Sequence, residues 1–324
     1  MRCFPVFSLA GLALITALAA CGGAIEPGDP GAVDLGGADP QTKDPYDIHG
    51  KPEPEAPMLG VHHAKDGGPA PKTTSTLMTG HGGAIMTDSV VKTIFWGPSW
   101  SNPTFAKDKI TGLNRLYSGL ASATAYVNSN TEYAGTNGRV GTAVQYIGTV
   151  TDLSATPKTA PRTTAILAEV CKMITNPVAN GYYPVYTDLK RGSAGYCAWH
   201  SYGVCGNVPV QFGFFFNLDG DAGCDPQDTQ TAHSQGLAAL ASVSGHEWSE
   251  TVTDPRNGGW WDAKGNENAD KCAWSFPPSL VTIVDPATAA TEGWKIQGNW
   301  SNAAFTAGTG YKNRDGEAGC LPSN

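Results

Sequence analysis

Hydrophobic positions along the 324-residue chain follow two patterns: short β-branched or aromatic runs, and longer stretches with a helical period. The short runs predict buried strands, and the periodic stretches predict helices that bury one face. The expected strands cover residues 89–97, 143–148, 182–186 and 208–216, and the expected helices cover 105–128, 162–175 and 230–253. Because strands alternate with helices, the sequence predicts a single layered α/β domain with a mixed sheet and flanking helices. Beyond residue 255 we expect a loop-rich part with weak strands near Val281 and Trp294.

The last predicted helix follows the last main strand, carries the sequence HEWSE at 246–250 and stops at Pro255. At about 100° per residue, its charged positions share one arc and its large apolar positions lie opposite. The charged arc comprises His246, Glu247, Glu250 and Asp254, and the apolar side comprises Leu237, Ala241, Trp248 and Val252. HEWSE is a variant of the HExxH motif of zinc peptidases, in which ligands at i and i+4 hold the metal and the Glu after the first His activates water. The pattern therefore predicts His246 and Glu250 as zinc ligands and Glu247 as the catalytic base.

A third zinc ligand in such enzymes comes from further along the chain. Glu267 and Asp270 follow the helix and are the two candidates, and Asp262 and Trp261 are candidate neighbours of the site. Trp261 could stack on a sugar ring or pack in the core near the site. The competing interpretation is a chance HExxE on a structural helix, because a carboxylate in place of the second His departs from the usual motif.

Other polar residues are weaker candidates for chemistry. His200 lies in a Gly- and Cys-rich segment, expected to be a loop, and could be a ligand, a substrate-binding residue or a structural hydrogen-bonding residue. The aspartates at 219, 221, 225 and 228 resemble a calcium loop in composition but lack EF-hand spacing, so a solvated turn is favoured over a Ca²⁺ site. No G-x-S-x-G, G-x-G-x-x-G or phosphate-binding loop occurs.

The charge of the chain argues against one class of partner. Its formal net charge is −8, and no cluster of Lys and Arg interrupts that acidic balance. A nucleic-acid partner is therefore not expected.

The N-terminal sequence indicates export. A basic start is followed by an apolar stretch, Leu9 to Ala20, that is too short to span a membrane permanently. It ends in Leu18-Ala19-Ala20-Cys21, which resembles a bacterial lipobox and predicts a signal peptide over 1–20 and a lipid on Cys21. Gly22 follows the cysteine in place of the Asp that retains such proteins at the inner membrane, so the resemblance implies the outer membrane or cell surface. An ordinary signal peptide cut after Ala20 is the alternative.

Residues 21–75 are rich in Gly, Pro, Asp and Lys without a hydrophobic period, so they predict a disordered tether before a domain over 76–324. The His62-His63 pair lies inside this tether and is expected to be solvated. The chain has 8 cysteines; Cys3 leaves with the signal peptide and Cys21 is the lipid site. The remaining six are Cys171, Cys197, Cys205, Cys224, Cys272 and Cys320, and they predict three disulfides of open connectivity. A zinc–thiolate cluster is disfavoured because no CxxC pair exists.

Several segments, in order, resemble the EXORDIUM or phosphate-induced protein family, which comprises secreted, cell-wall-associated proteins best known from plants. They are GHGG at 80–83, FWGPSW at 95–100, CAWH at 197–200, HEWSE at 246–250, TDP at 253–255 and ENADKC at 267–272. The resemblance covers most of 76–324 and implies a shared site of His200, His246, Glu247, Glu250, Glu267 and Asp270. It weakens Asp254, because the family has Asn there, and it implies an extracellular protein without a settled activity.

Two functions follow from these observations. The first is a surface lipoprotein with a zinc-dependent hydrolase site of the metallopeptidase kind, acting on a peptide or cell-wall polymer. The second is a non-catalytic module that binds cell-wall glycan or a protein partner, with a structural polar cluster. Bound zinc with an open coordination position would distinguish the first from the second.

Overall fold

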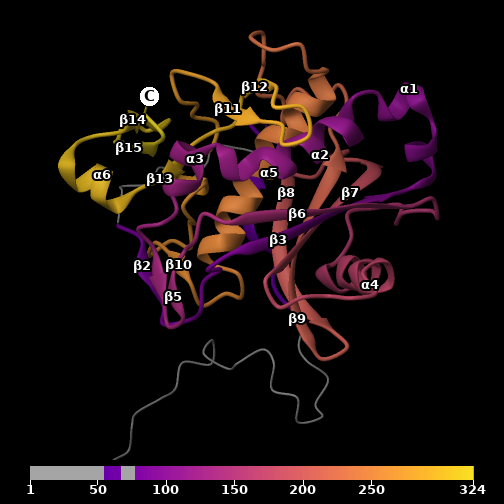
Figure 1. Cartoon of the computed structure of the whole chain (residues 1–324), viewed down its shortest axis with the longest axis horizontal. Coiled ribbons are helices and arrows are strands. Elements are labelled where there is room, and N and C mark those ends of the chain that lie inside the picture. The colour runs from indigo at the N-terminus through magenta and orange to yellow at the C-terminus, as the bar shows by residue number, and fades with distance from the viewer. Residues whose placement is uncertain (1–54, 67–76, 324) are drawn as a thin grey trace, which may run out of the picture. The chain divides into compact units, whose positions relative to one another are not determined.

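The computed structural model describes residues 55–66 and 77–323. A six-stranded mixed sheet forms the centre of the fold, with the strand order β1-β8-β9-β7-β3-β6 (Figure 1). Its strands are β1 (Leu59–His63), β3 (Ser89–Trp96), β6 (Val144–Asp152), β7 (Gly181–Lys190), β8 (Tyr196–Cys205) and β9 (Val208–Asn217). β6, β3, β7 and β9 run parallel, whereas β8 is antiparallel to β9 and β1 is antiparallel to β8. The expected mixed α/β architecture is confirmed.

Helices cover both faces of the sheet. The main helices are α2 (Lys109–Gly119), α4 (Thr163–Met173) and α5 (Gln235–Thr253). On one face, the Tyr186 hydroxyl of β7 hydrogen-bonds to Tyr117 of α2 and to Ser244 of α5. On the other face, a Cβ at Gly203 of β8 would touch Leu167 of α4, so α4 packs closely there. Buried β-branched and aromatic residues, such as those of β3 and β9, suit strands that are covered on both sides.

Smaller elements surround this core. They are β2 (Thr79–Gly80), η2 (Pro98–Ser101), α1 (Pro103–Ala106), η3 (Leu120–Ser122), α3 (Thr124–Asn128), β4 (Ala134–Gly135), β5 (Gly138–Arg139), β10 (Trp260–Trp261), η4 (Asp270–Cys272), β11 (Val281–Val284), β12 (Thr291–Trp294), β13 (Asn299–Trp300), α6 (Asn302–Ala307), β14 (Tyr311–Lys312) and β15 (Ala318–Leu321). The predicted helix over 105–128 is divided into α1, α2, η3 and α3, with turns between them at Lys107 and Ala123. The weak strands expected near Val281 and Trp294 pair with each other as β11 and β12.

Two expectations about the sheet are wrong. The Gly- and Cys-rich segment around His200 is the ten-residue strand β8, not a loop. Part of the expected tether is also folded, because Leu59–His63 pairs with β8 and buries Leu59 and His62. Both errors have one physical cause. Strand formation here depends on pairing with a distant segment, and neither segment has a strong alternating pattern of its own. The folded domain therefore includes residues 55–66.

Three disulfides are present, as expected, and the structure supplies their pairing: Cys171–Cys205, Cys197–Cys224 and Cys272–Cys320. They indicate an oxidising, extracellular environment. The predicted signal peptide, the lipid site at Cys21 and residues 21–54 of the expected tether lie outside the described residues. Among the described residues, no helix has both the length and the apolar character needed to cross a membrane.

Candidate metal centre

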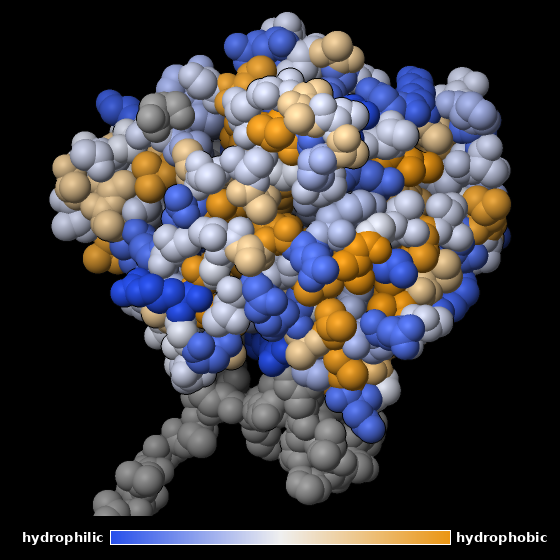
Figure 2. All heavy atoms as spheres, viewed as in Figure 1, coloured by the Kyte–Doolittle hydropathy of each residue, from blue (hydrophilic) through white to orange (hydrophobic). Residues whose placement is uncertain are grey.

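Helix α5 carries the HExxE sequence through the interior of the protein. The Ser234 hydroxyl caps its first turn by accepting a hydrogen bond from the Leu237 amide, and the helix ends at Thr253, with Asp254 as the C-cap residue before Pro255. The expectation of one packed and one presented face needs correction, because every α5 residue from Gly236 onward is buried. Its polar residues after Gly236 therefore face other parts of the protein, whereas the surface in Figure 2 is a mixture of polar and apolar residues.

The first set of donors joins α5 to the segment after it. The Nε2 atom of His246 lies 3.1 Å from Oε2 of Glu250 and 3.6 Å from Oδ1 of Asp270. His246 Nε2 and Glu250 Oε2 are both fully buried, and apart from this contact with each other and with Asp270 they have no hydrogen-bond partner among the described residues. Two donors that share a tetrahedral zinc ion at about 2.0–2.1 Å are about 3.3–3.4 Å apart, between the two observed distances. The spacing thus fits a shared cation.

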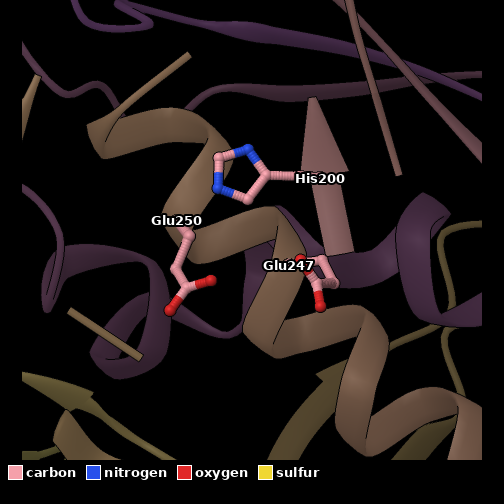
Figure 3. A group of neighbouring side chains, drawn as sticks. All are labelled: His200, Glu247 and Glu250. Carbon is pink, nitrogen blue, oxygen red and sulfur yellow. The ribbon is translucent and has the colours of Figure 1, made fainter. Parts of the chain in front are cut away.

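A second set overlaps the first. Donor atoms of His200, Glu247 and Glu250 lie within 4.8 Å of one another, and all three side chains are buried. Figure 3 shows His200 extending from β8 toward the helix that carries both glutamates. No side chain of the described residues hydrogen-bonds to the carboxylate of Glu247, which has only the backbone of His62 beside it as a donor. Buried carboxylates with few partners are costly, so these converging groups could bind a metal ion.

Backbone amides orient the carboxylates of this cluster. The Asp270 amide donates to Glu250 Oε1 over 2.8 Å, and the Glu267 amide donates to Asp270 Oδ2 over 3.1 Å. Each contact occupies one oxygen and directs the other, Oε2 of Glu250 and Oδ1 of Asp270, toward His246. Such supporting hydrogen bonds are typical of metal ligands.

Glu267 is placed differently from the other predicted ligands. Its Oε1 lies 3.2 Å from His200 Nε2, and it belongs to neither of the two donor groups found among the described residues. The geometry therefore favours Asp270 as the third ligand and Glu267 as the partner that orients His200.

The charge balance of the cluster also suits a cation. Burial raises the pKa of Glu247 and Glu267 well above the usual range and raises the pKa of Glu250 to about 7. Burial, followed by the nearby charge of His246, lowers the pKa of His200 to about 3. Burial also opposes protonation of His246, but the carboxylates of Glu250 and Asp270 raise its pKa well above the usual value. The carboxyl groups of Glu247, Glu250, Glu267 and Asp270 lie close together. A divalent cation would offset their mutual repulsion.

The structure adds two residues that sequence reasoning missed. Nδ1 of His62 and Nε2 of Gln297 each lie 2.8 Å from His246 Nδ1. The Gln297 amide is fixed because its Nε2 donates to Ala269 O and its Oε1 accepts from the Trp274 amide. When His246 is neutral, Nδ1 accepts from the Gln297 amide and the proton on Nε2 faces Glu250. Metal binding at Nε2 would release that proton. The available sequence signal was the His pair after a short apolar run at 59–61.

Other predicted site residues lie outside the donor groups. Asp254 accepts hydrogen bonds from the amides of Gly258 and Gly259, so it terminates the helix. Asp262 forms a buried ion pair with Lys271, and Trp261 stacks on the ring of His81. The four aspartates whose composition resembles a calcium loop bind protein groups. Asp219 pairs with Lys109 and Asp221 with Arg191, and Asp225 and Asp228 accept hydrogen bonds from nearby backbone amides.

Comparisons of the chain with protein-family models, with curated proteins and with solved structures find no match. The resemblance to the EXORDIUM family therefore stays a prediction, and the case for function depends on the site itself.

Proposed function

We propose that this protein is a zinc-dependent hydrolase of the metallopeptidase kind, exported and held at the cell surface through a lipid on Cys21. The observation that supports the metal is the convergence of buried donor atoms of the HExxE helix with His200 of β8 on one side and the partly exposed Asp270 on the other. The donor set of one imidazole and two carboxylates suits zinc.

The residues have distinct roles in this proposal. His246, Glu250 and Asp270 hold the ion, and His200, held by Glu267, lies on the β8 side of the site. A zinc ion bound there would act as a Lewis acid toward the substrate carbonyl and, by its charge, favour the ionised form of Glu247. A carboxylate oxygen of Glu247 then accepts a proton from the attacking water. It delivers that proton to the leaving nitrogen as the C–N bond breaks and the new C–O bond remains.

Three substitutions test the assignment when the full chain is purified without chelator. His246→Ala should lose zinc, because one of three protein ligands is gone. Glu247→Gln should keep one zinc per chain and lose hydrolysis of a peptide library by about 10²-fold or more, since an amide cannot accept the proton. Asp228→Asn is the control, because this carboxylate accepts hydrogen bonds from Gln230 and Thr231 and lies outside both donor groups. It should change neither property.

The alternative is a non-catalytic module that binds cell-wall glycan or a protein partner. The complete burial of His246, Glu247 and Glu250 favours it, since no polymer reaches them in the described conformation. A zinc-free wild-type protein that also fails to take up added zinc would support this alternative and contradict the hydrolase. Bound zinc without cleavage of any peptide would leave a structural metal.

A further inference from the structure

The strand β1 covers the candidate metal centre. It pairs with the outer edge of β8, with Leu59 opposite His200 and His62 opposite Ala198. It also contacts α5 and the turn η4, which carry the remaining donors. The donor residues of α5 and β8 are fully buried in this arrangement.

Gly60 brings the backbone of β1 directly against the donors. Its φ is +47°, and a Cβ added there would lie 2.0 Å from Glu250 Oε2 and 2.7 Å from His200 Nε2. Two residues later, the ring of His62 contacts the ring of His246, with centroids 3.9 Å apart. A side chain at position 60 would therefore displace either the strand or the donors.

The segment is held partly by side chains, such as those of His62, Lys65 and Asp66, and partly through its backbone. The Ser201 hydroxyl donates to the carbonyl of Pro57, and the Trp274 indole donates to the carbonyl of His63, each over 2.8 Å. The Ala64 amide donates to Gly195 O over 3.0 Å, which extends the pairing beyond the ladder. Contacts to main-chain atoms recognise an extended chain without requiring a particular sequence, as in strand addition to a sheet edge.

We propose that the outer edge of β8 is a groove for an extended polypeptide, antiparallel to β8 and with glycine over Glu250, and that residues 55–66 occupy it as an internal ligand. This inference depends on the proposed hydrolase function, because it names the substrate class of the same site. The substrate is then a polypeptide with a glycine at the position that Gly60 now fills. While residues 55–66 are bound along β8, they prevent the substrate from binding there.

Gly60→Val and Gly192→Val form a matched pair for the test. Both residues have a positive φ, +47° and +59°, but a side chain at Gly192 meets nothing within 4 Å. Hydrogen exchange is measured on the full chain. Gly60→Val should speed exchange of the β8 amides that face β1 by about tenfold or more, whereas Gly192→Val should leave them within about twofold of wild type. Equal exchange in the two variants would overturn the proposal.

A second experiment does not depend on the folding of Gly60→Val. A site-specific protease sequence is placed within residues 67–76, the chain is cut there, and a labelled synthetic peptide of residues 55–66 is added. The peptide should bind saturably and restore β8 protection, and its Gly60→Val form should not bind. With zinc present, the peptide should also inhibit hydrolysis by the cut chain.

The outcomes separate this inference from the proposed function. A cut chain that binds the peptide but contains no zinc supports the groove and contradicts the hydrolase. A zinc-loaded cut chain that binds neither peptide form supports the metal site and overturns the groove.

Discussion

The disulfide Cys272–Cys320 ties the turn that carries Asp270 to the C-terminal strand β15. Cys272 is the last residue of η4, which begins at Asp270, and Cys320 is buried in β15. If this bond positions Asp270, its removal should weaken zinc binding as well as folding. The perturbation is the double variant Cys272→Ala/Cys320→Ala.

A second disulfide provides a control of similar size. Cys171–Cys205 joins α4 to β8 on the opposite face of the sheet and closes a separation of 34 residues, compared with 48 for Cys272–Cys320. By chain entropy alone, loss of either crosslink lowers the free energy of unfolding by about 4 kcal/mol. The two double variants should therefore be similarly destabilised.

The zinc affinities should differ. Removal of supporting contacts around a metal ligand typically weakens binding about 10–100-fold, and this loss is expected only for Cys272→Ala/Cys320→Ala. Urea unfolding of zinc-free protein gives the stability, and competition with a fluorescent chelator gives the zinc affinity. Equal zinc affinity in the two double variants would refute the view that Cys272–Cys320 positions Asp270.

Two further predictions concern residues away from the donors. Cys21→Ser should abolish fatty-acid labelling and release the protein from membranes, and unchanged membrane association in a fractionation assay would contradict lipid anchoring. Asp262→Asn should lower the free energy of unfolding by about 1–3 kcal/mol, because it removes the charge of the carboxylate that lies 3.2 Å from the buried Lys271 ammonium. Asp262→Asn combined with Lys271→Met should recover most of that loss in urea unfolding, and no recovery would show that the pair is not the cause.

Much of the fold follows from local pattern. The sequence shows the apolar runs of β3, β7 and β9, because these strands bury nearly every side chain. It also shows the helical period of α4 and α5, because apolar side chains recur at each turn. β1 and β8 are not visible in this way. The segment Leu59–His63 is short and lies in a Pro- and Gly-rich stretch, and it forms a strand only because the edge of β8 is available.

Local sequence pattern likewise predicts only part of the candidate site. His246, Glu247 and Glu250 follow from helical spacing, since positions i and i+4 always share a face. Spacing does not decide whether Glu267 or Asp270 is the third ligand. That choice depends on backbone hydrogen bonds: the Glu267 amide binds Oδ2 of Asp270 and the Asp270 amide binds Oε1 of Glu250, which leaves the other oxygen of each carboxylate free. The contacts of His62 and Gln297 with His246 depend on chain pairing across 184 and 51 residues, which no local pattern records.

Zinc K-edge X-ray absorption on the full chain, purified without chelator, tests the central claim most directly. The account predicts one zinc per chain with only nitrogen and oxygen neighbours at about 2.0–2.1 Å, unchanged in Glu247→Gln and absent in His246→Ala. A wild-type protein without zinc after incubation with excess zinc would contradict it. So would a zinc ion with sulfur neighbours at about 2.3 Å.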